Sequence, residues 1–252
     1  MSNYVITGAN SEIGRALAQF LLAKNHEVLL VSRSAKSVAD STVKWIDGVD
    51  LTKECDLLRL REYIRKCFST PFTLIHSVGD FWAHKSVTNT SFDEVVSQIQ
   101  SHYVTLFGVV KAVVPIMQAV GGGRIIAFSC NSVRYNYPDM AAFTSSKAAV
   151  ECLIKCVANE QSKYNITANA FALPSIKTNN VLETKPEAFH KNYPTLSELS
   201  ETVEQTIENL SPLVNGNVIS LFKYSDSFYH KGYYERNIIW EANQDERVGG
   251  LL

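Results

Sequence analysis

Two glycines near the start of the chain have the spacing of a phosphate-binding turn. Gly8 follows the strand-like run 4–7, and Gly14 comes six residues later, where an amphipathic stretch begins. The first glycine permits a tight turn after a strand, and the second lets the following helix pack against the sheet. Because free N–H groups at a helix start attract phosphate, the loop predicts a dinucleotide site. The loop residues that we expect to contact the dinucleotide are Gly8, Asn10, Ser11, Ile13 and Gly14.

Glu12 is the irregular residue of this loop, because a middle glycine is expected at its position. Its carboxylate would either repel a pyrophosphate or turn outward, where a negative charge favours the start of a helix. We favour the outward orientation.

The second apolar run, 28–31, ends in Ser32, Arg33 and Ser34. NAD(H) is usually held at this point by an acidic side chain that binds the ribose hydroxyls, and no acid is present here. Arg33 between two serines has the chemistry to bind a phosphate through charge-assisted hydrogen bonds. The segment therefore favours NADP(H) over NAD(H), and the alternative is a surface arginine beside a solvated loop.

Alternating strands and helices must position these residues. Short apolar runs alternate with longer amphipathic stretches, and the runs lack the period-two pattern of strands with one exposed face. We expect strands near 4–7, 28–31, 74–76, 124–128, 166–171 and 217–222, and helices near 13–24, 54–67, 93–119, 141–161 and 197–209. This order predicts an α/β fold of the Rossmann type, a doubly wound parallel sheet of about seven strands with helices on both faces.

The ligand of such a sheet lies at the carboxyl ends of the strands. No linker rich in glycine, proline or serine divides the chain, so we expect residues 1–252 to form a single domain. Segment 174–196 is the least regular part and contains Pro186 and Pro194, and we expect it to form a substrate lid.

Composition excludes several classes of protein. The 24 basic and 25 acidic side chains nearly cancel, which argues against nucleic acid as a partner. No apolar run approaches the ~20 residues that span a bilayer, and the N-terminus lacks the pattern of a signal peptide, so we expect a cytoplasmic protein without membrane contact.

Five cysteines without a C-x-x-C pair predict neither a disulfide framework nor a metal site, and the histidines show no metal spacing. Cys152 and Cys156 lie four residues apart, and we expect both to be small buried side chains.

Taken together, these segments are similar to the short-chain dehydrogenase/reductase family, most similar in pattern to its 3-oxoacyl-carrier-protein reductases. Residues 7–14 match the family's T-G-x-x-x-G-x-G except at position 12, and Asp50-Leu51 stands where the family places an acid-aliphatic pair against the adenine. The resemblance covers nearly the whole chain. It adds the following residues to the expected cofactor contacts: Ser77, Val78 and Gly79 at the family's N-N-A-G position, and Ile176 and Thr178 in its nicotinamide segment.

The resemblance also implies four catalytic positions, which family members fill with asparagine, serine, tyrosine and lysine. The tyrosine exchanges a proton with the substrate oxygen, and the lysine lowers the pKa of that phenol and holds the nicotinamide ribose. In this chain the four positions are His102, Cys130, Phe143 and Lys147, so only the lysine matches. A positioned general acid contributes ~10²–10⁴-fold to a rate, and a phenyl ring donates no proton, so we expect carbonyl reduction by the family route to be impaired.

Other groups have the chemistry to supply the proton. The imidazole of His102 titrates near neutral pH, but the family position lies behind the lysine. Tyr135 and Tyr137 follow Cys130 and could turn a phenol inward, although packing is the simpler role for both. Cys130 would act as a nucleophile only if its pKa were lowered. Phe81, Trp82, His84 and Tyr137 suggest an aromatic-lined substrate pocket.

Three hypotheses about function follow. The first is an NADP(H)-dependent reductase of a carbonyl group, small or linked to an acyl carrier, with an unusual proton source. The second is a catalytically silent subunit that assembles with an active relative. The third is non-redox chemistry in the same pocket. As in the family, we expect assembly through helices 93–119 and 141–161, as a homo-oligomer (dimer or tetramer) or a hetero-oligomer; the apolar ending 248–252 is a further docking segment.

Overall fold

The computed structural model describes residues 2–34, 43–80, 82 and 84–221. Its centre is one seven-stranded sheet in the order β3-β2-β1-β4-β5-β6-β7, and every neighbouring pair is parallel. The strands are β1 (Asn3–Thr7), β2 (Glu27–Val31), β3 (Lys44–Ile46), β4 (Phe72–His76), β5 (Gly123–Cys130), β6 (Ile166–Leu173) and β7 (Val218–Ser220). The predicted doubly wound parallel sheet is confirmed.

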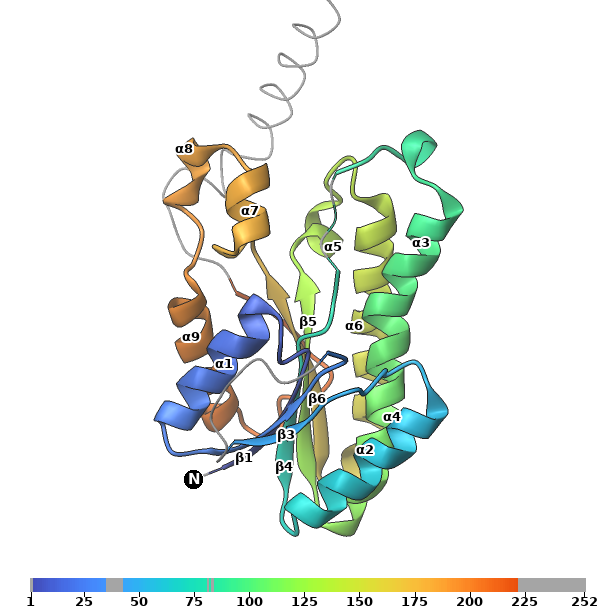
Figure 1. Cartoon of the computed structure of the whole chain (residues 1–252), viewed down its shortest axis with the longest axis vertical. Helices are drawn as coiled ribbons and strands as arrows, with labels where there is room; N and C mark the ends of the chain where they lie inside the picture. The colour runs from blue at the N-terminus through green and yellow to red at the C-terminus, as the bar shows by residue number, and fades with distance from the viewer. Residues whose placement is uncertain (1, 35–42, 81, 83, 222–252) are drawn as a thin grey trace, which may run out of the picture.

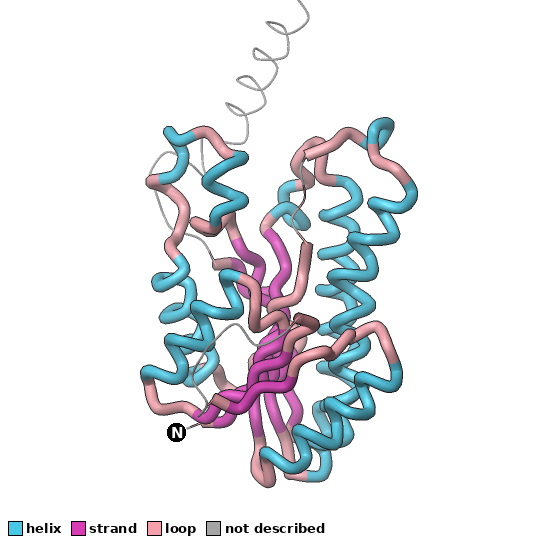
Figure 2. The backbone as a smooth tube through the Cα atoms, viewed as in Figure 1, coloured by secondary structure: helices cyan, strands magenta, loops and turns pink. Residues whose placement is uncertain are grey.

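Helices cover both faces of the sheet (Figures 1 and 2). The described helices are α1 (Glu12–Ala23), α2 (Glu54–Cys67), α3 (Phe92–Ile99), α4 (Thr105–Ala119), α5 (Ser132–Tyr135), α6 (Ala141–Gln161), α7 (Asn179–Thr184), α8 (Glu187–His190) and α9 (Leu196–Asn209). Short 3-10 turns lie at Val87–Asn89 and Ser162–Tyr164, and a π-helical turn, Gln100–Val104, joins α3 to α4.

Alternate residues of the strands enter two separate cores. Val5 and Leu29 pack under α2, α4 and α6, whereas Tyr4 and Ile6 pack under α1 and α9. This explains why the strands read as continuous apolar runs, since both faces of each strand are buried. The short edge strand β3 escaped the sequence analysis, because three residues that include Lys44 are too few to show a pattern.

One continuous helical stretch, Phe92–Ala119, is long and apolar enough to span a bilayer by length and composition, which corrects the expectation that no run comes near that length. Of its most apolar window, 56% is buried inside the protein. Leu106, Val109 and Val113 are completely buried in the core between the sheet and its neighbouring helices. The stretch therefore has the environment of a core helix.

Segment 174–196 contains the short helices α7 and α8, which the sequence analysis did not identify, and its role as a lid stays a prediction. One further expectation was wrong: Cys152 and Cys156 are exposed on the outer face of α6, because that face of the helix points away from the sheet. The apolar ending 248–252 lies outside the described residues.

Candidate active site

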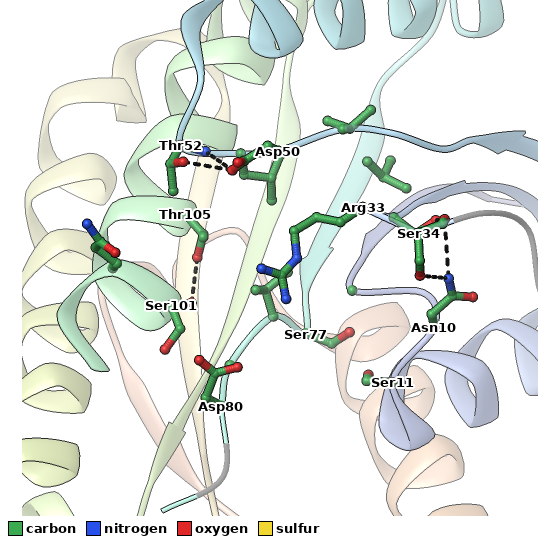
Figure 3. A pocket seen from close by; sticks show the side chains of 18 of the residues that line it. Asn10, Ser11, Arg33, Ser34, Asp50, Thr52, Ser77, Asp80, Ser101 and Thr105 are labelled. Carbon is green, nitrogen blue, oxygen red and sulfur yellow. Dashed lines mark hydrogen bonds between the residues drawn. The ribbon is translucent and has the colours of Figure 1, made fainter. Parts of the chain in front are cut away.

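A pocket of about 340 Å³ opens at the carboxyl ends of β1, β2 and β4. Figure 3 shows its side chains converging from these strand ends and from the α3–α4 region. The expected cofactor residues that line it are Gly8, Asn10, Ser11, Ser32, Arg33, Ser34, Asp50, Leu51, Ser77, Val78 and Gly79. The structure therefore brings together residues from four separate segments that the sequence analysis had selected one by one.

The glycine loop forms one wall of the pocket. Gly8 has a φ of +75°, and a Cβ at this position would lie 2.9 Å from the backbone of Ser77, so the loop requires glycine here. Gly14 does not line the pocket, because it packs directly on the carbonyl of Gly8, where a Cβ would lie 2.3 Å from the oxygen. Ser11 caps α1 by accepting a hydrogen bond from the N–H of Gly14 at 3.0 Å.

The turn after β2 presents Arg33 to the pocket. The hydroxyl of Ser32 accepts from the indole of Trp45 at 3.0 Å and donates to the carbonyl of Ser34 at 2.8 Å, so it stabilises the turn itself. Asn10 donates to the hydroxyl of Ser34 at 2.7 Å, which joins the turn to the glycine loop. The Arg33 side chain reaches into the pocket between these walls (Figure 3).

Asp50 lies on the opposite wall. The hydroxyl and the backbone N–H of Thr52 donate to its Oδ1 at 2.7 and 3.0 Å, and Lys53 lies 3.7 Å from its other oxygen. These hydrogen bonds, together with Lys53 and Arg33, lower the pKa of the Asp50 carboxyl below its usual value. Asp50 is therefore an ionised acceptor at neutral pH.

The segment after β4 is held by hydroxyl groups. Ser77 donates to the carbonyl of Thr7 at 2.7 Å. His76 lies 2.8 Å from the hydroxyl of Thr7 and 3.2 Å from that of Thr105, which itself donates to the carbonyl of Ser101. The imidazole therefore accepts at Nδ1 and donates at Nε2. Burial lowers the pKa of His76 to about 3, so this side chain is neutral.

Several lining residues were missed by the sequence analysis: Val31, Val49, Thr52, Asp80, Ser97, Gln100, Ser101 and Thr105. Four of them belong to α3, α4 and the π-helical turn between these helices. Small polar residues on a helix are common, and only the packing of this helix beside β4 brings them to the pocket. The sequence could have indicated the other four, because each adjoins an expected contact: Val31, Val49, Thr52 and Asp80.

Phe143 and Lys147 lie one turn apart on the first half of α6. The Lys147 ammonium donates to the carbonyl of Phe128 at 3.0 Å and lies 5.7 Å from the centre of the Phe143 ring. Burial lowers the pKa of Lys147 to about 8. The lysine therefore faces a hydrocarbon ring at the position where a phenol would share its proton.

His102 is buried behind this pair, with 1% of its surface exposed. Its Nδ1 lies 2.8 Å from the hydroxyl of Ser146, which donates to the carbonyl of Phe143. Its ring meets the Phe143 ring edge to face at 5.2 Å, and a Cβ on Gly79 would lie 2.7 Å from it. Burial and Lys147 lower the pKa of His102 to about 2, so the imidazole is neutral at physiological pH.

Cys130 is half-buried at the end of β5, and its Sγ accepts a weak hydrogen bond from the N–H of Ser132 at 3.4 Å. The preceding Ser129 turns away and donates to Glu151 on α6 at 2.6 Å. The thiol therefore lies on the same side of the sheet end as Lys147, whose pKa it raises slightly.

The nicotinamide segment follows β6 and does not line the 340 Å³ pocket. Ile176 is buried in the core under α1 and α9, so only its backbone is available to a cofactor. Thr178 is half-buried and precedes α7. Ile13 is likewise half-buried and packs against the same core. The residues expected to contact a dinucleotide thus divide between an open group at the ends of β1, β2 and β4, expected at its adenosine end, and a more buried group after β6, expected at its nicotinamide end.

The expected aromatic-lined substrate pocket stays a prediction. Phe81 lies outside the described residues. Trp82 is buried and donates to the carbonyl of Asp139 at 2.8 Å, which assigns it a packing role. Tyr135 and Tyr137 stack on each other at 5.8 Å. Among the described residues no group of three or more His, Cys, Asp or Glu side chains has the arrangement of a metal site.

Comparison with known proteins agrees with this architecture. Residues 2–188 match the family model of the short chain dehydrogenases. The chain is 28% identical to the fatty acyl-CoA reductase of Acinetobacter baylyi over 204 residues, which are 77% of this chain and 68% of that protein. It is 24% identical to the 3-oxoacyl-acyl-carrier-protein reductase of Mus musculus over 224 residues, which are 85% and 93% of the two chains.

A solved structure extends the similarity to three dimensions. A tyrosine-to-phenylalanine variant of ElxO with NADPH bound has a TM-score of 0.78 at 22% identity, over 87% of this chain and 96% of the other. At this identity the likeness concerns the fold. From the match over residues 2–188 and the parallel sheet with its glycine loop, we conclude that the chain belongs to the short-chain dehydrogenase/reductase family.

Proposed function

We propose that this chain binds NADP(H) and is an oxidoreductase of the family with an atypical proton-transfer site. The observation that carries the proposal is Arg33, which reaches into a pocket formed by the glycine loop and the strand ends (Figure 3). Among the described residues that line this pocket, Arg33 is the single cation. A guanidinium forms paired hydrogen bonds with phosphate, which suits the extra phosphate that distinguishes NADP(H).

The pocket fits such a group in two further respects. The start of α1 lies beside it, and helix N-termini attract phosphate. Gly8 and Gly79 both approach other parts of the protein too closely for a side chain, so backbone forms the floor of the site. When bound, the cofactor would supply or accept a hydride. Lys147 and Thr178 are the side chains that we assign to its nicotinamide end.

The proton-transfer end departs from the pattern of the family. Phe143 offers no proton to a carbonyl oxygen, and the neutral, buried His102 cannot replace it. The similar ElxO variant, with phenylalanine in place of a tyrosine, was solved with NADPH bound, which supports cofactor binding without a phenol. We propose that any reduction of a ketone here takes its proton from water or from a side chain of the segment 130–137.

The relatives suggest the class of substrate. Two of them are named for acyl groups carried on coenzyme A or on acyl carrier protein. An acyl-linked ketone is therefore the substrate that we would offer first, with small carbonyl compounds beside it. We assign segment 174–196 as the lid over it.

Titration with NADPH and NADH tests the proposal. We expect the wild-type chain to bind NADPH more tightly, and Arg33→Ala to weaken NADPH by about 10- to 100-fold while NADH binding changes little, since a charge-assisted hydrogen bond contributes roughly 1.5–3 kcal/mol. Arg65→Ala, which removes an exposed arginine of α2, is the matched control. Equal NADPH affinity in the wild type and Arg33→Ala would exclude Arg33 as the phosphate ligand.

A catalytically silent subunit is the second candidate, and the outer face of the α3–α4 stretch favours it. Phe92, Val96 and Phe107 are 91%, 52% and 49% exposed along one side of the α3–α4 stretch. Apolar side chains in this number are typical of a face that another chain covers. Native mass spectrometry of the protein from its own cell would detect a family partner, and a species made only of this chain would argue against the subunit role.

A further inference from the structure

Glu12 caps a helix to which it does not belong. Its two carboxylate oxygens lie 3.0 and 3.2 Å from the backbone nitrogen of Asn179, the first residue of α7, and accept its N–H. The residue before α7, Thr178, makes no capping hydrogen bond with its own side chain. The free N–H at the start of α7 is therefore satisfied by the glycine loop, 167 positions earlier in the chain.

The same carboxylate belongs to the first turn of α1, beside the phosphate-binding end of the pocket. Gly8, Asn10 and Ser11 line the pocket, whereas Glu12 is not among the lining residues. The contact with Asn179 thus holds a negative charge outside the pocket. Without that contact, the free N–H groups of its own helix would attract the carboxylate, as they would attract a phosphate.

The other end of α7 is held from the opposite side. Lys185, directly after α7, has its Nζ 2.6 Å from Nε2 of His84 in the segment that follows β4. Figure 1 shows α7 beyond the start of α1, at the carboxyl end of the sheet. The segment 178–185 thus runs from the glycine loop to the segment after β4, next to the residues assigned to the nicotinamide end.

We propose that Glu12 is a positioning residue that couples segment 178–185 to the dinucleotide pocket. While its carboxylate caps α7, the phosphate-binding N–H groups of α1 stay available. When the segment moves away, the carboxylate turns to these N–H groups and opposes the nucleotide. The coupling rests on the proposed NADP(H) function, whereas the cap of α7 does not.

Two measurements on the full chain test this proposal: amide hydrogen exchange of residues 179–185 without nucleotide, and titration with NADPH. Glu12→Gly removes both the cap and the charge. Glu12→Gln keeps an oxygen that can accept from Asn179 but removes the charge. Gln19→Gly, on the exposed side of α1, is the control for placing a glycine in this helix.

We expect Glu12→Gly to accelerate exchange in α7 about fivefold, since an N-cap contributes on the order of 1 kcal/mol. Glu12→Gln should exchange like the wild type and bind NADPH about twofold more tightly, because segment 178–185 leaves Glu12 part of the time and only the charged side chain then competes for the N–H groups of α1. Gln19→Gly should match the wild type in both measurements.

Unchanged exchange in Glu12→Gly would overturn the cap, and unchanged NADPH affinity in Glu12→Gln would overturn the coupling. If the wild type binds no NADPH, the proposed function and the coupling fail together, while the exchange data still decide whether Glu12 caps α7.

Discussion

The adenosine end of the site and the first half of α6 contrast in how they are built. The adenosine end is open and polar, with Arg33, the ionised Asp50 and several hydroxyl groups around a pocket of about 340 Å³. The first half of α6 buries Lys147 and His102 against the Phe143 ring. The first region holds groups that can bind a charged ligand, and the second presents the hydrocarbon ring of Phe143 to the Lys147 ammonium.

The two regions are formed mostly by different elements. The pocket lies at the ends of β1, β2 and β4, whereas Cys130, Phe143 and Lys147 come from β5 and α6. The π-helical turn contributes to both, with Gln100 and Ser101 in the pocket lining and His102 beside Phe143. The Phe143 ring also packs on His102, so the altered region has a packed interior of its own. The proposed cofactor binding and the proposed proton transfer therefore depend on largely separate groups of side chains.

The largest effect should come from restoring the phenol. We expect Phe143→Tyr to raise NADPH-dependent reduction of acyl-linked ketones by about 100-fold or more, because a positioned general acid contributes ~10²–10⁴-fold. The ring lies 5.7 Å from the Lys147 ammonium, which can lower the pKa of the new phenol. Reduction is followed by the absorbance of NADPH.

Phe107→Tyr, on the exposed side of α4, is the control for this change and should leave the rate unchanged. If Phe143→Tyr reduces no ketone of a carrier-linked and small-molecule panel faster than the wild type, the region around Lys147 lacks more than the hydroxyl group of a tyrosine.

A second effect concerns how the free energy of unfolding depends on pH. Burial lowers the pKa of Lys147 to about 8, below its value in an unfolded chain. Between pH 8 and about 10.4 the unfolded chain therefore binds more protons, and the free energy of unfolding should rise with pH by up to about 3 kcal/mol from this group. Below pH 8 the lysine is protonated in both states and contributes no slope. Urea denaturation at several pH values measures the rise.

Lys147→Met should lack this rise, and Lys155→Met, which removes an exposed lysine of the same helix, should keep it. If the free energy of unfolding changes with pH in the same way in the wild type and in Lys147→Met, the Lys147 ammonium is well solvated. The two regions would then not differ in burial as described.

The smallest effect concerns the outer face of α6. If this face pairs with another chain, Cys152 and Cys156 should be alkylated several-fold more slowly at high protein concentration than after dilution. Cys55, exposed on α2, should react equally under both conditions. Burial and Cys152 raise the pKa of the Cys156 thiol, so each thiol is compared with itself at the two concentrations. Equal rates by mass spectrometry would argue against an interface on α6.

Much of the architecture was predictable from local patterns. The expected helices 54–67 and 141–161 coincide with α2 and α6, because amphipathic spacing defines helices of this length well. Strand β3 and helices α7 and α8 were not predictable. β3 includes Lys44 among only three residues and therefore lacks the apolar run that marks the other strands. Helices of four and six residues make fewer than two turns, too few for a helical period to emerge.

The candidate site divides in the same way. The glycine loop and Arg33 could be predicted because each is identified by its neighbours in sequence. A strand precedes each of them, and a helix follows the loop. For Glu12, the sequence favoured an outward-turned carboxylate but did not indicate its partner, because Asn179 is 167 positions away in the chain. The exposure of Cys152 and Cys156 depends likewise on which face of α6 meets the sheet.

By itself, the sequence determined the parallel sheet and the glycine loop, and it placed Phe143 four residues before Lys147, because these features follow from residue type and short-range spacing. Only the tertiary structure decided that His102 is buried and neutral, that Ser97 and Ser101 reach the pocket, and that the glycine loop caps α7. The physical reason is that burial and long-range hydrogen bonds depend on which surfaces meet, and one chain read along its length does not contain that information.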